Sequence, residues 1–122
     1  MTFDLMKYRL LTDLRSLELP IDEVEIFVRP FSKTYYGRYY PTCSDRLPKI
    51  YVYPFESDGS VMPYETVLNI VIHEMCHHLQ YRQGYNRKFG VMHNTQFWKS
   101  YNFYIEHAKR LNLYEDREEV AI

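Results

Sequence analysis

One long segment, predicted to be helical and apolar on every side near its centre, constrains the fold most. Pro63 suits the first position of a helix, where its missing N–H is not needed, and Gly84 suits the C-terminal cap. The sequence from Pro63 to about Gln83 is therefore predicted to be helical. Its apolar run Val67–Ile72 is far too short to cross a membrane. A helix that is apolar all round must be buried, so we expect the other elements to pack around it.

The segment before this helix predicts an N-terminal helix and three short strands. Thr2 is a candidate N-cap, and apolar residues at steps of three and four make one stripe, which Pro20 ends. Alternation of polar and apolar residues predicts the strands, and Pro54 favours an edge position for the third, because proline cannot donate to the ladder. The helical stripe consists of Phe3, Met6, Leu10, Leu14 and Leu17, and the strands cover Val24–Val28, Tyr35–Tyr40 and Ile50–Phe55.

A closing helix is predicted near the C-terminal end, with Asn94 or Thr95 as its cap. Its apolar stripe consists of Phe97, Tyr101, Tyr104, Ile105, Ala108 and Leu111, and the acidic tail from about residue 115 is expected to fray. No internal repeat or linker is visible, and 122 residues are the size of one ordinary domain. The sequence therefore predicts a single α+β domain over residues 1–122, with an N-terminal helix, a small three-stranded sheet, the central helix and the closing helix.

Composition narrows the class of protein. Hydrophobic residues make up 46% and charged residues 25% of the chain, which is typical of globular proteins. The formal net charge of −1 excludes a general electrostatic attraction to nucleic acid as the main basis of function. Asp4, Lys7 and Arg9 stand where a signal peptide needs an apolar stretch, and Cys43 and Cys76 make no disulfide framework. We expect a cytoplasmic protein with reduced thiols and no membrane partner.

The residues that carry chemistry lie within the central helix, in the sequence His73-Glu-Met-Cys-His77. Histidines four residues apart share one face of a helix, so both imidazoles can bind a single Zn²⁺. Glu74 projects beside that face, near a water held in the open position of the metal, where it is placed to take a proton. The sequence therefore predicts one zinc ion per chain, and histidines that are solvated or hydrogen-bonded at a helix end are the alternative.

A catalytic zinc site needs a third protein ligand, and His93 is the preferred candidate. The central helix carries the chain roughly 9 Å beyond His77, at 1.5 Å per residue. The loop from Gly84 to Met92 is long enough to return over that distance. His93 then enters immediately before the closing helix, where packing fixes its position.

Other residues compete for this role. Glu106 is the next candidate, although an ion pair with Arg110 explains both residues more simply. Cys43 is a further alternative from the β region, as in peptide deformylases, but no accompanying glycine-rich motif is present. We expect Cys76 and His78 to have structural roles and His107 to be solvated.

Five segments together resemble a known family. They are Leu19–Ile26, Tyr36–Arg38, Ile50–Tyr53, His73–His77 and His93–Phe97. With them the chain, to about residue 112, resembles the SprT-like zinc metallopeptidase domain of the Spartan-type proteases. In that family the third ligand stands in a His-Gly-x-x-Phe pattern, which this chain matches with Asn94 in place of Gly, and Phe97-Trp98 is also similar to YgjP-like metallopeptidases. The resemblance implies a zincin-like fold in which His73, His77 and His93 bind zinc and Glu74 is the catalytic acid/base.

The resulting hypothesis is a zinc-dependent endopeptidase that acts on a protein or peptide substrate, with DNA-associated proteins as one candidate class of substrate. Zinc polarises the scissile carbonyl, and Glu74 moves a proton from the attacking water to the leaving amine. The strand Ile50–Phe55 is a candidate for pairing with the substrate backbone. Tyr81, Tyr85 and Tyr101 are candidates for stabilising the oxyanion. The alternatives are a non-catalytic, zinc-stabilised module that binds protein or DNA, and a deformylase-like enzyme with Cys43 at the metal.

DNA stays an alternative partner with weaker support. The 122 residues contain no Cys-x-x-Cys pair of the kind found in the zinc ribbon of many SprT-like proteins, so action on DNA–protein crosslinks does not follow from the resemblance. Between Arg82 and Arg110 six Lys and Arg residues stand against the single acid Glu106, with Tyr81, Tyr85 and Phe89 as candidate stacking partners. A solvated helix face and loop is the favoured explanation of these charges.

Overall fold

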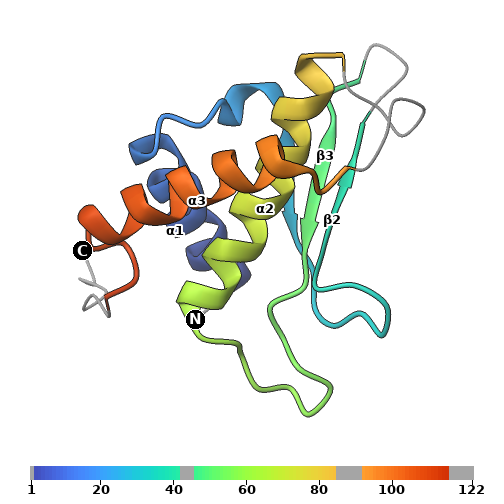
Figure 1. The fold of residues 1–122 in the computed structure, drawn as a ribbon. Helices are drawn as coiled ribbons and strands as arrows, with labels where there is room; N and C mark the ends of the chain where they lie inside the picture. Colours follow the sequence, from blue (N-terminus) through green and yellow to red (C-terminus); the bar gives the residue numbers. More distant parts are fainter. Residues whose placement is uncertain (1, 42–45, 85–91, 116–122) are drawn as a thin grey trace.

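A computed structural model describes residues 2–41, 46–84 and 92–115, and in these residues three α-helices pack with a small sheet (Figure 1). The elements are α1 (Phe3–Ser16), a short 3-10 helix η1 (Ile21–Glu23), β1 (Glu25–Val28), β2 (Gly37–Tyr40), β3 (Lys49–Val52), α2 (Tyr64–Arg82) and α3 (Thr95–Arg110). The predicted α+β class, the three helices and the three strands are confirmed. The predicted acidic tail lies mostly outside the described residues.

The sheet is mixed, with the strand order β1-β3-β2. β3 runs parallel to β1 and antiparallel to β2, and Ile50 on β3 lies opposite Ile26 on one side and Tyr39 on the other. The expectation that Pro54 marks an edge strand is therefore wrong. β3 ends at Val52, so Pro54 lies beyond the paired residues and its missing N–H costs the ladder nothing.

The second predicted helix is the centre of the structure. α2 packs against β2, β3 and α3, and five of its side chains are completely buried, namely Val67, Leu68, Val71, Ile72 and Met75. The helix begins one residue after Pro63, and Gly84 follows its C-cap with a φ of +81°, a conformation that favours glycine. In the described part of the chain neither α2 nor another helix combines the length and apolar character of a membrane span.

The first helix begins as predicted. The Thr2 hydroxyl accepts a hydrogen bond from the Leu5 N–H at 3.1 Å and so caps α1. Met6, Leu10 and Leu14 are buried as expected, but Phe3 is 41% exposed. Phe3 lies in the first turn, and there its ring packs only edge-on against Phe55, with the ring centres 5.2 Å apart.

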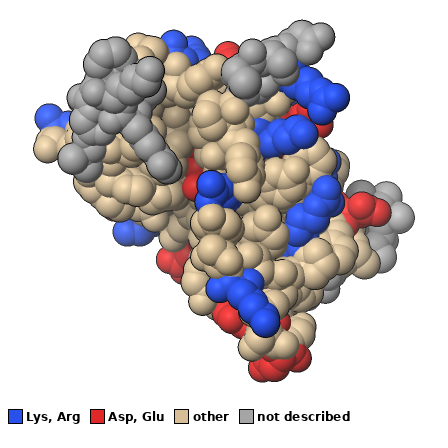
Figure 2. All heavy atoms as spheres, turned by 90° about the vertical axis from the view of Figure 1, so that its right-hand side faces the viewer, with Lys and Arg blue, Asp and Glu red and all other residues tan. Residues whose placement is uncertain are grey.

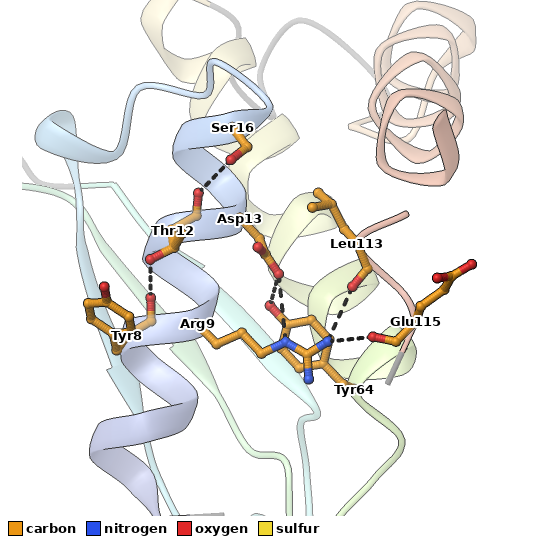
Figure 3. Close-up of polar contacts among 8 residues, drawn as sticks. All are labelled: Tyr8, Arg9, Thr12, Asp13, Ser16, Tyr64, Leu113 and Glu115. Atoms are coloured by element: carbon orange, nitrogen blue, oxygen red, sulfur yellow. Dashed lines mark hydrogen bonds and ion pairs between the residues drawn. The ribbon is translucent and has the colours of Figure 1, made fainter. Parts of the chain in front are cut away.

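A buried polar cluster joins α1 to the start of α2 and to the chain after α3 (Figure 3). The Tyr64 hydroxyl donates to Asp13 Oδ2 at 2.7 Å, and Arg9 Nε lies 3.8 Å from the same oxygen. The Arg9 guanidinium lies over the Tyr64 ring, 3.5 Å from its centre, and its Nη2 donates to the carbonyl oxygens of Leu113 and Glu115. Three segments far apart in sequence are thus held at one point.

The closing helix is capped by Asn94, whose side-chain oxygen accepts from the Phe97 N–H at 2.9 Å. Of the predicted stripe, Phe97 and Ala108 are fully buried, whereas Leu111 is 43% exposed. Leu111 is the C-cap, and Leu113, two residues later, takes the buried position instead, while Tyr114 donates a hydrogen bond to Asn69 of α2. α3 is therefore anchored in the core near both ends, by Phe97 at its start and by Ala108 in its last turn.

Candidate metal centre

The structure brings the three predicted histidines together. His73 and His77 project from α2, one turn apart, and His93 stands just before the cap of α3. His93 Nε2 lies 3.1 Å from Nε2 of His73 and 3.1 Å from Nε2 of His77. Among the described residues these three form the one such cluster of candidate metal ligands, with ligand atoms within 4.8 Å of one another. A tetrahedral zinc ion at 2.0–2.1 Å from each nitrogen separates them by about 3.3 Å, so the donor set fits.

One aromatic ring supports all three imidazoles. Phe97 is 1% exposed, and its ring centre lies 4.9 Å from His73, 4.7 Å from His77 and 4.9 Å from His93. Because Asn94 caps the helix through the Phe97 N–H, the same turn of α3 fixes both this ring and the backbone next to His93. The short pattern from His93 to Phe97 therefore places a ligand and its support in one local unit.

Gln80 orients one ligand and was not identified from the sequence. Its Nε2 donates to the Met92 carbonyl at 2.6 Å, which leaves Oε1 to accept from Nδ1 of His77 at 3.1 Å. The proton of His77 is thereby placed on Nδ1, and Nε2 keeps its lone pair for a metal. Gln80 also ties α2 to the residue before His93. Its spacing of three residues from His77 was the available signal.

The electrostatics of the cluster suit metal binding. Burial, together with the neighbouring His77 and His93, lowers the pKa of His73 to about 4. The His73 imidazole is therefore neutral near neutral pH. Neutral imidazole is the form that binds a metal ion.

Glu74 carries a buried carboxylate, one oxygen of which lacks a hydrogen-bond partner among the described residues. Its side chain is 6% exposed, and within the described part of the chain Oε2 has no hydrogen-bond partner. Burial raises the pKa of Glu74 to about 7, although the charge of Arg38 acts in the opposite direction. Buried polar groups normally have partners, so this one calls for a functional explanation. A carboxyl with this pKa can exchange a proton near neutral pH.

Glu74 borders a cleft of about 470 Å³. His73 and Glu74 of α2 line it, with Tyr101 of α3 and residues 34–37. Gly37 is required at this wall, because a Cβ atom there would clash with the Ile70 side chain and lie 3.4 Å from Glu74 Cγ. β2 can therefore pass close to the site only because it begins with glycine.

The competing candidates lie elsewhere. Glu106 is exposed and lies outside the histidine cluster, and its ion-pair partner is Lys109 at 3.2 Å, so the predicted pairing with Arg110 is wrong. His78 is buried and structural as predicted, since it donates to Glu23 and accepts from the Tyr39 hydroxyl. Cys76 is also buried, and burial raises the pKa of its thiol to about 12.

Two further predictions have different outcomes. His107 is half-buried, and its Nδ1 has no hydrogen-bond partner among the described residues, so the expectation that it is solvated is wrong. Cys43 lies outside the described residues, as do Tyr85 and Phe89. No protein-family model, curated protein or solved structure matches this chain. Function is therefore argued from the site, and the SprT-like resemblance stays a prediction.

Proposed function

We propose that this protein is a zinc-dependent peptidase of zincin type, as its SprT-like sequence pattern predicts. The observation that carries the proposal is the convergence of three imidazole nitrogens beside a buried carboxylate that opens onto a cleft. Three nitrogen ligands suit zinc and leave a fourth position open, as in catalytic sites. A structural zinc site needs a fourth protein ligand, and the described residues offer none in this cluster.

In this proposal His73, His77 and His93 hold the metal and Glu74 handles the proton. Zinc, when bound, supplies Lewis-acid activation of a peptide carbonyl and of water. Glu74 accepts the proton of the attacking water and passes it to the leaving amine, roles that require a pKa near the working pH. Burial raises that pKa, and within the described residues no hydrogen-bond partner engages Oε2 of Glu74.

The substrate is proposed to lie along β2 rather than β3. β3 is bordered by strands on both sides, whereas β2 ends the sheet and residues 34–37, which lead into it, line the cleft. An extended peptide can add to such an edge through backbone hydrogen bonds. Tyr101 is the oxyanion candidate that this arrangement favours, because it lines the same cleft. Tyr81, by contrast, packs against Tyr39.

The first test is metal content. Elemental analysis is expected to find about one zinc per chain in the wild type and in His107→Ala, and far less in His93→Ala. His107 is the matched control, because it lies on α3 outside the cluster. A folded wild type without zinc, or a His93→Ala variant that keeps it, would overturn the three-histidine site.

The second test asks whether the metal has an open position. Replacing zinc by Co²⁺ gives a visible spectrum, and adding acetohydroxamic acid is expected to shift it, because this small chelator needs a free coordination site. An unchanged spectrum would favour the alternative of a non-catalytic, zinc-stabilised binding module. Cleavage of an unfolded protein, followed by mass spectrometry, then reports turnover, with Glu74→Gln as the inactive partner.

A further inference from the structure

Asn69 lines the cleft beside the metal centre, and the proposed mechanism gives it no role. It projects from α2 one helical turn before His73, so the two side chains share a face of the helix. Thr66 and Ile70 line the cleft with it from α2, and residues 34–37 form the wall that leads into β2. Asn69 is half-buried, which leaves part of its side chain open to the cleft.

The side-chain amide of Asn69 is held in one orientation. Its Oδ1 accepts a hydrogen bond from the Tyr114 hydroxyl, and Tyr114 does not itself line the cleft. An asparagine side chain has an oxygen acceptor on one arm of its amide and two N–H donors on the other. Those donors have no hydrogen-bond partner among the described residues. The amide therefore presents N–H groups, rather than its carbonyl oxygen, to the cleft.

Tyr114 is well placed to fix this orientation. Leu113, before it, is buried, and Arg9 Nη2 donates to the carbonyl oxygens of Leu113 and Glu115 at 3.3 and 3.1 Å (Figure 3). The polar cluster of α1 thus holds the chain on both sides of Tyr114. Burial above all, together with the neighbouring Tyr101, raises the pKa of the Tyr114 hydroxyl to about 12. The hydroxyl is therefore protonated near neutral pH and can donate to Asn69.

A peptide at the edge of β2 needs donors on its far side. An extended strand pairs through one edge and leaves the backbone groups of alternate residues unpaired on the other. On that free edge carbonyl groups recur at every second residue, about 6.7 Å apart. Asn69 and His73 lie one helical turn, about 5.4 Å, apart along α2. When one carbonyl of the free edge lies at the metal, the next one on that edge is within reach of the Asn69 side chain.

The donors of this cleft are neutral groups. Figure 2, which looks at the β2 and β3 side of the molecule, shows Lys and Arg side chains spread over this side. None of the described Lys and Arg residues lines the cleft, however, and Asn69 carries the one side-chain amide among its lining residues. A neutral N–H suits a peptide carbonyl, whereas the carboxylate of a chain end is bound best by a cation. The cleft therefore suits an internal stretch of a peptide better than its C-terminal end.

We propose that Asn69 is a substrate-binding residue, whose N–H groups donate to the peptide carbonyl two residues from the scissile one. Tyr114 is the positioning residue that keeps these N–H groups turned towards the cleft. The inference rests on the proposed peptidase function, because it takes the scissile carbonyl to lie at the metal. It assigns the cleft to an extended, internal stretch of a protein chain that is held by β2 on one side and by α2 on the other.

The test compares three hydroxamates on the Co²⁺-substituted protein, whose visible spectrum reports binding. Acetohydroxamic acid reaches only the metal. Acetyl-Ala-Ala hydroxamate and a succinyl hydroxamate coupled to alaninamide extend from the metal in opposite chain directions, and each carries a carbonyl at the required distance. Asn69→Asp keeps the acceptor for Tyr114 and removes the N–H donors. Affinity for one of the two longer probes is expected to fall about 5- to 150-fold, and affinity for acetohydroxamic acid is expected to stay unchanged.

Two further variants separate binding from structure. Tyr114→Phe frees the Asn69 amide to rotate and is expected to weaken the same probe about 2- to 5-fold. Asn102→Asp, at an exposed asparagine of α3 outside the cleft, is the matched control and is expected to change no affinity.

The outcomes distinguish this proposal from the metal site. An equal loss for all three probes in Asn69→Asp, or no loss for any of them, would overturn the role of Asn69. So would a wild type that binds the longer probes no more tightly than acetohydroxamic acid. A folded protein that takes up no Co²⁺ would instead overturn the metal site, and this proposal with it.

Discussion

Two helices of this protein each bury a carboxylate, in opposite surroundings. Asp13 on α1 is 1% exposed, accepts a hydrogen bond from the Tyr64 hydroxyl and lies beside Arg9 (Figure 3). Glu74 on α2 is 6% exposed, and its Oε2 has no hydrogen-bond partner among the described residues. Both side chains lose water on folding, but Asp13 gains a hydrogen-bond donor and an adjacent guanidinium, whereas at Glu74 the charge of Arg38 does not outweigh burial.

The difference separates a structural carboxylate from a functional one. A buried acid that has its partners contributes to folding, since removing it would leave those partners unsatisfied. A buried acid without them costs stability and keeps its neutral form accessible, and burial indeed raises the pKa of Glu74 to about 7. Perturbed groups that border a cleft are candidates for catalysis. The following predictions test this contrast.

The largest effect is expected on peptide hydrolysis. Glu74→Gln removes the proton acceptor and keeps the size of the side chain, so kcat is expected to fall by about 10²- to 10⁴-fold with zinc content unchanged. Asp13→Asn is the matched substitution, and its kcat per folded molecule is expected to stay near the wild-type value. Steady-state kinetics on the same peptide compares the two. Equal losses of kcat would remove the distinction between the carboxylates.

The next effect is on the free energy of unfolding, and there Asp13 rather than Glu74 is the carboxylate that is expected to matter more. Asp13→Ala removes the acceptor of the Tyr64 hydroxyl and the buried carboxylate beside Arg9, so the free energy of unfolding is expected to fall by about 3 kcal/mol. Asp22→Ala, at an exposed aspartate, is expected to change it by less than about 0.5 kcal/mol. Urea denaturation followed by circular dichroism measures both. A loss for Asp13→Ala no greater than that of the control would mean that the cluster is not stabilising.

A smaller effect is expected from the residue that orients His77. Gln80→Leu removes the acceptor of the His77 Nδ1 proton and the donor to Met92, so zinc affinity is expected to fall about 10- to 100-fold. Gln83→Leu, at an exposed position one turn later, is the control. Competition with a chromophoric chelator gives both affinities. Unchanged affinity in Gln80→Leu would show that His77 does not need this partner.

The parts that sequence predicted correctly are mostly local. A side chain that caps its own helix, such as Thr2 or Asn94, depends on three or four neighbouring residues. The spacing of His73 and His77 is likewise a property of a single helix. His93 required one further inference, the return of the loop. The structure places it with the other two, and the helix that follows fixes its position.

The parts that sequence missed depend on contacts between distant segments. The alternation of polar and apolar residues identifies a strand but not its neighbours. Pro54 therefore suggested an edge position for β3, which is the central strand of the sheet. The role of Gln80 depends on the Met92 carbonyl, twelve residues later, which no helical pattern reveals. The exposure of Leu111 depends on where α3 ends, because Leu113 then takes the buried position. In each case local chemistry specified the residue type, and tertiary packing specified its partner.

The last prediction concerns the pH dependence of stability in the metal-free protein. Because burial raises the pKa of Glu74 from 4.5 to about 7, the folded state favours the protonated carboxyl. The corresponding stability is fully present below pH 4.5 and is lost as the pH rises through about 7. Glu74→Gln carries a neutral amide at every pH and escapes this loss. The free energy of unfolding of the variant minus that of the wild type is therefore expected to rise across this interval and then level off. Urea denaturation with a chelator, from about pH 5 to about pH 8, measures this difference, in which the shared titration of His73 cancels. A difference that stays constant over that range would contradict a raised pKa and would make Glu74 an ordinary acid like those on the surface.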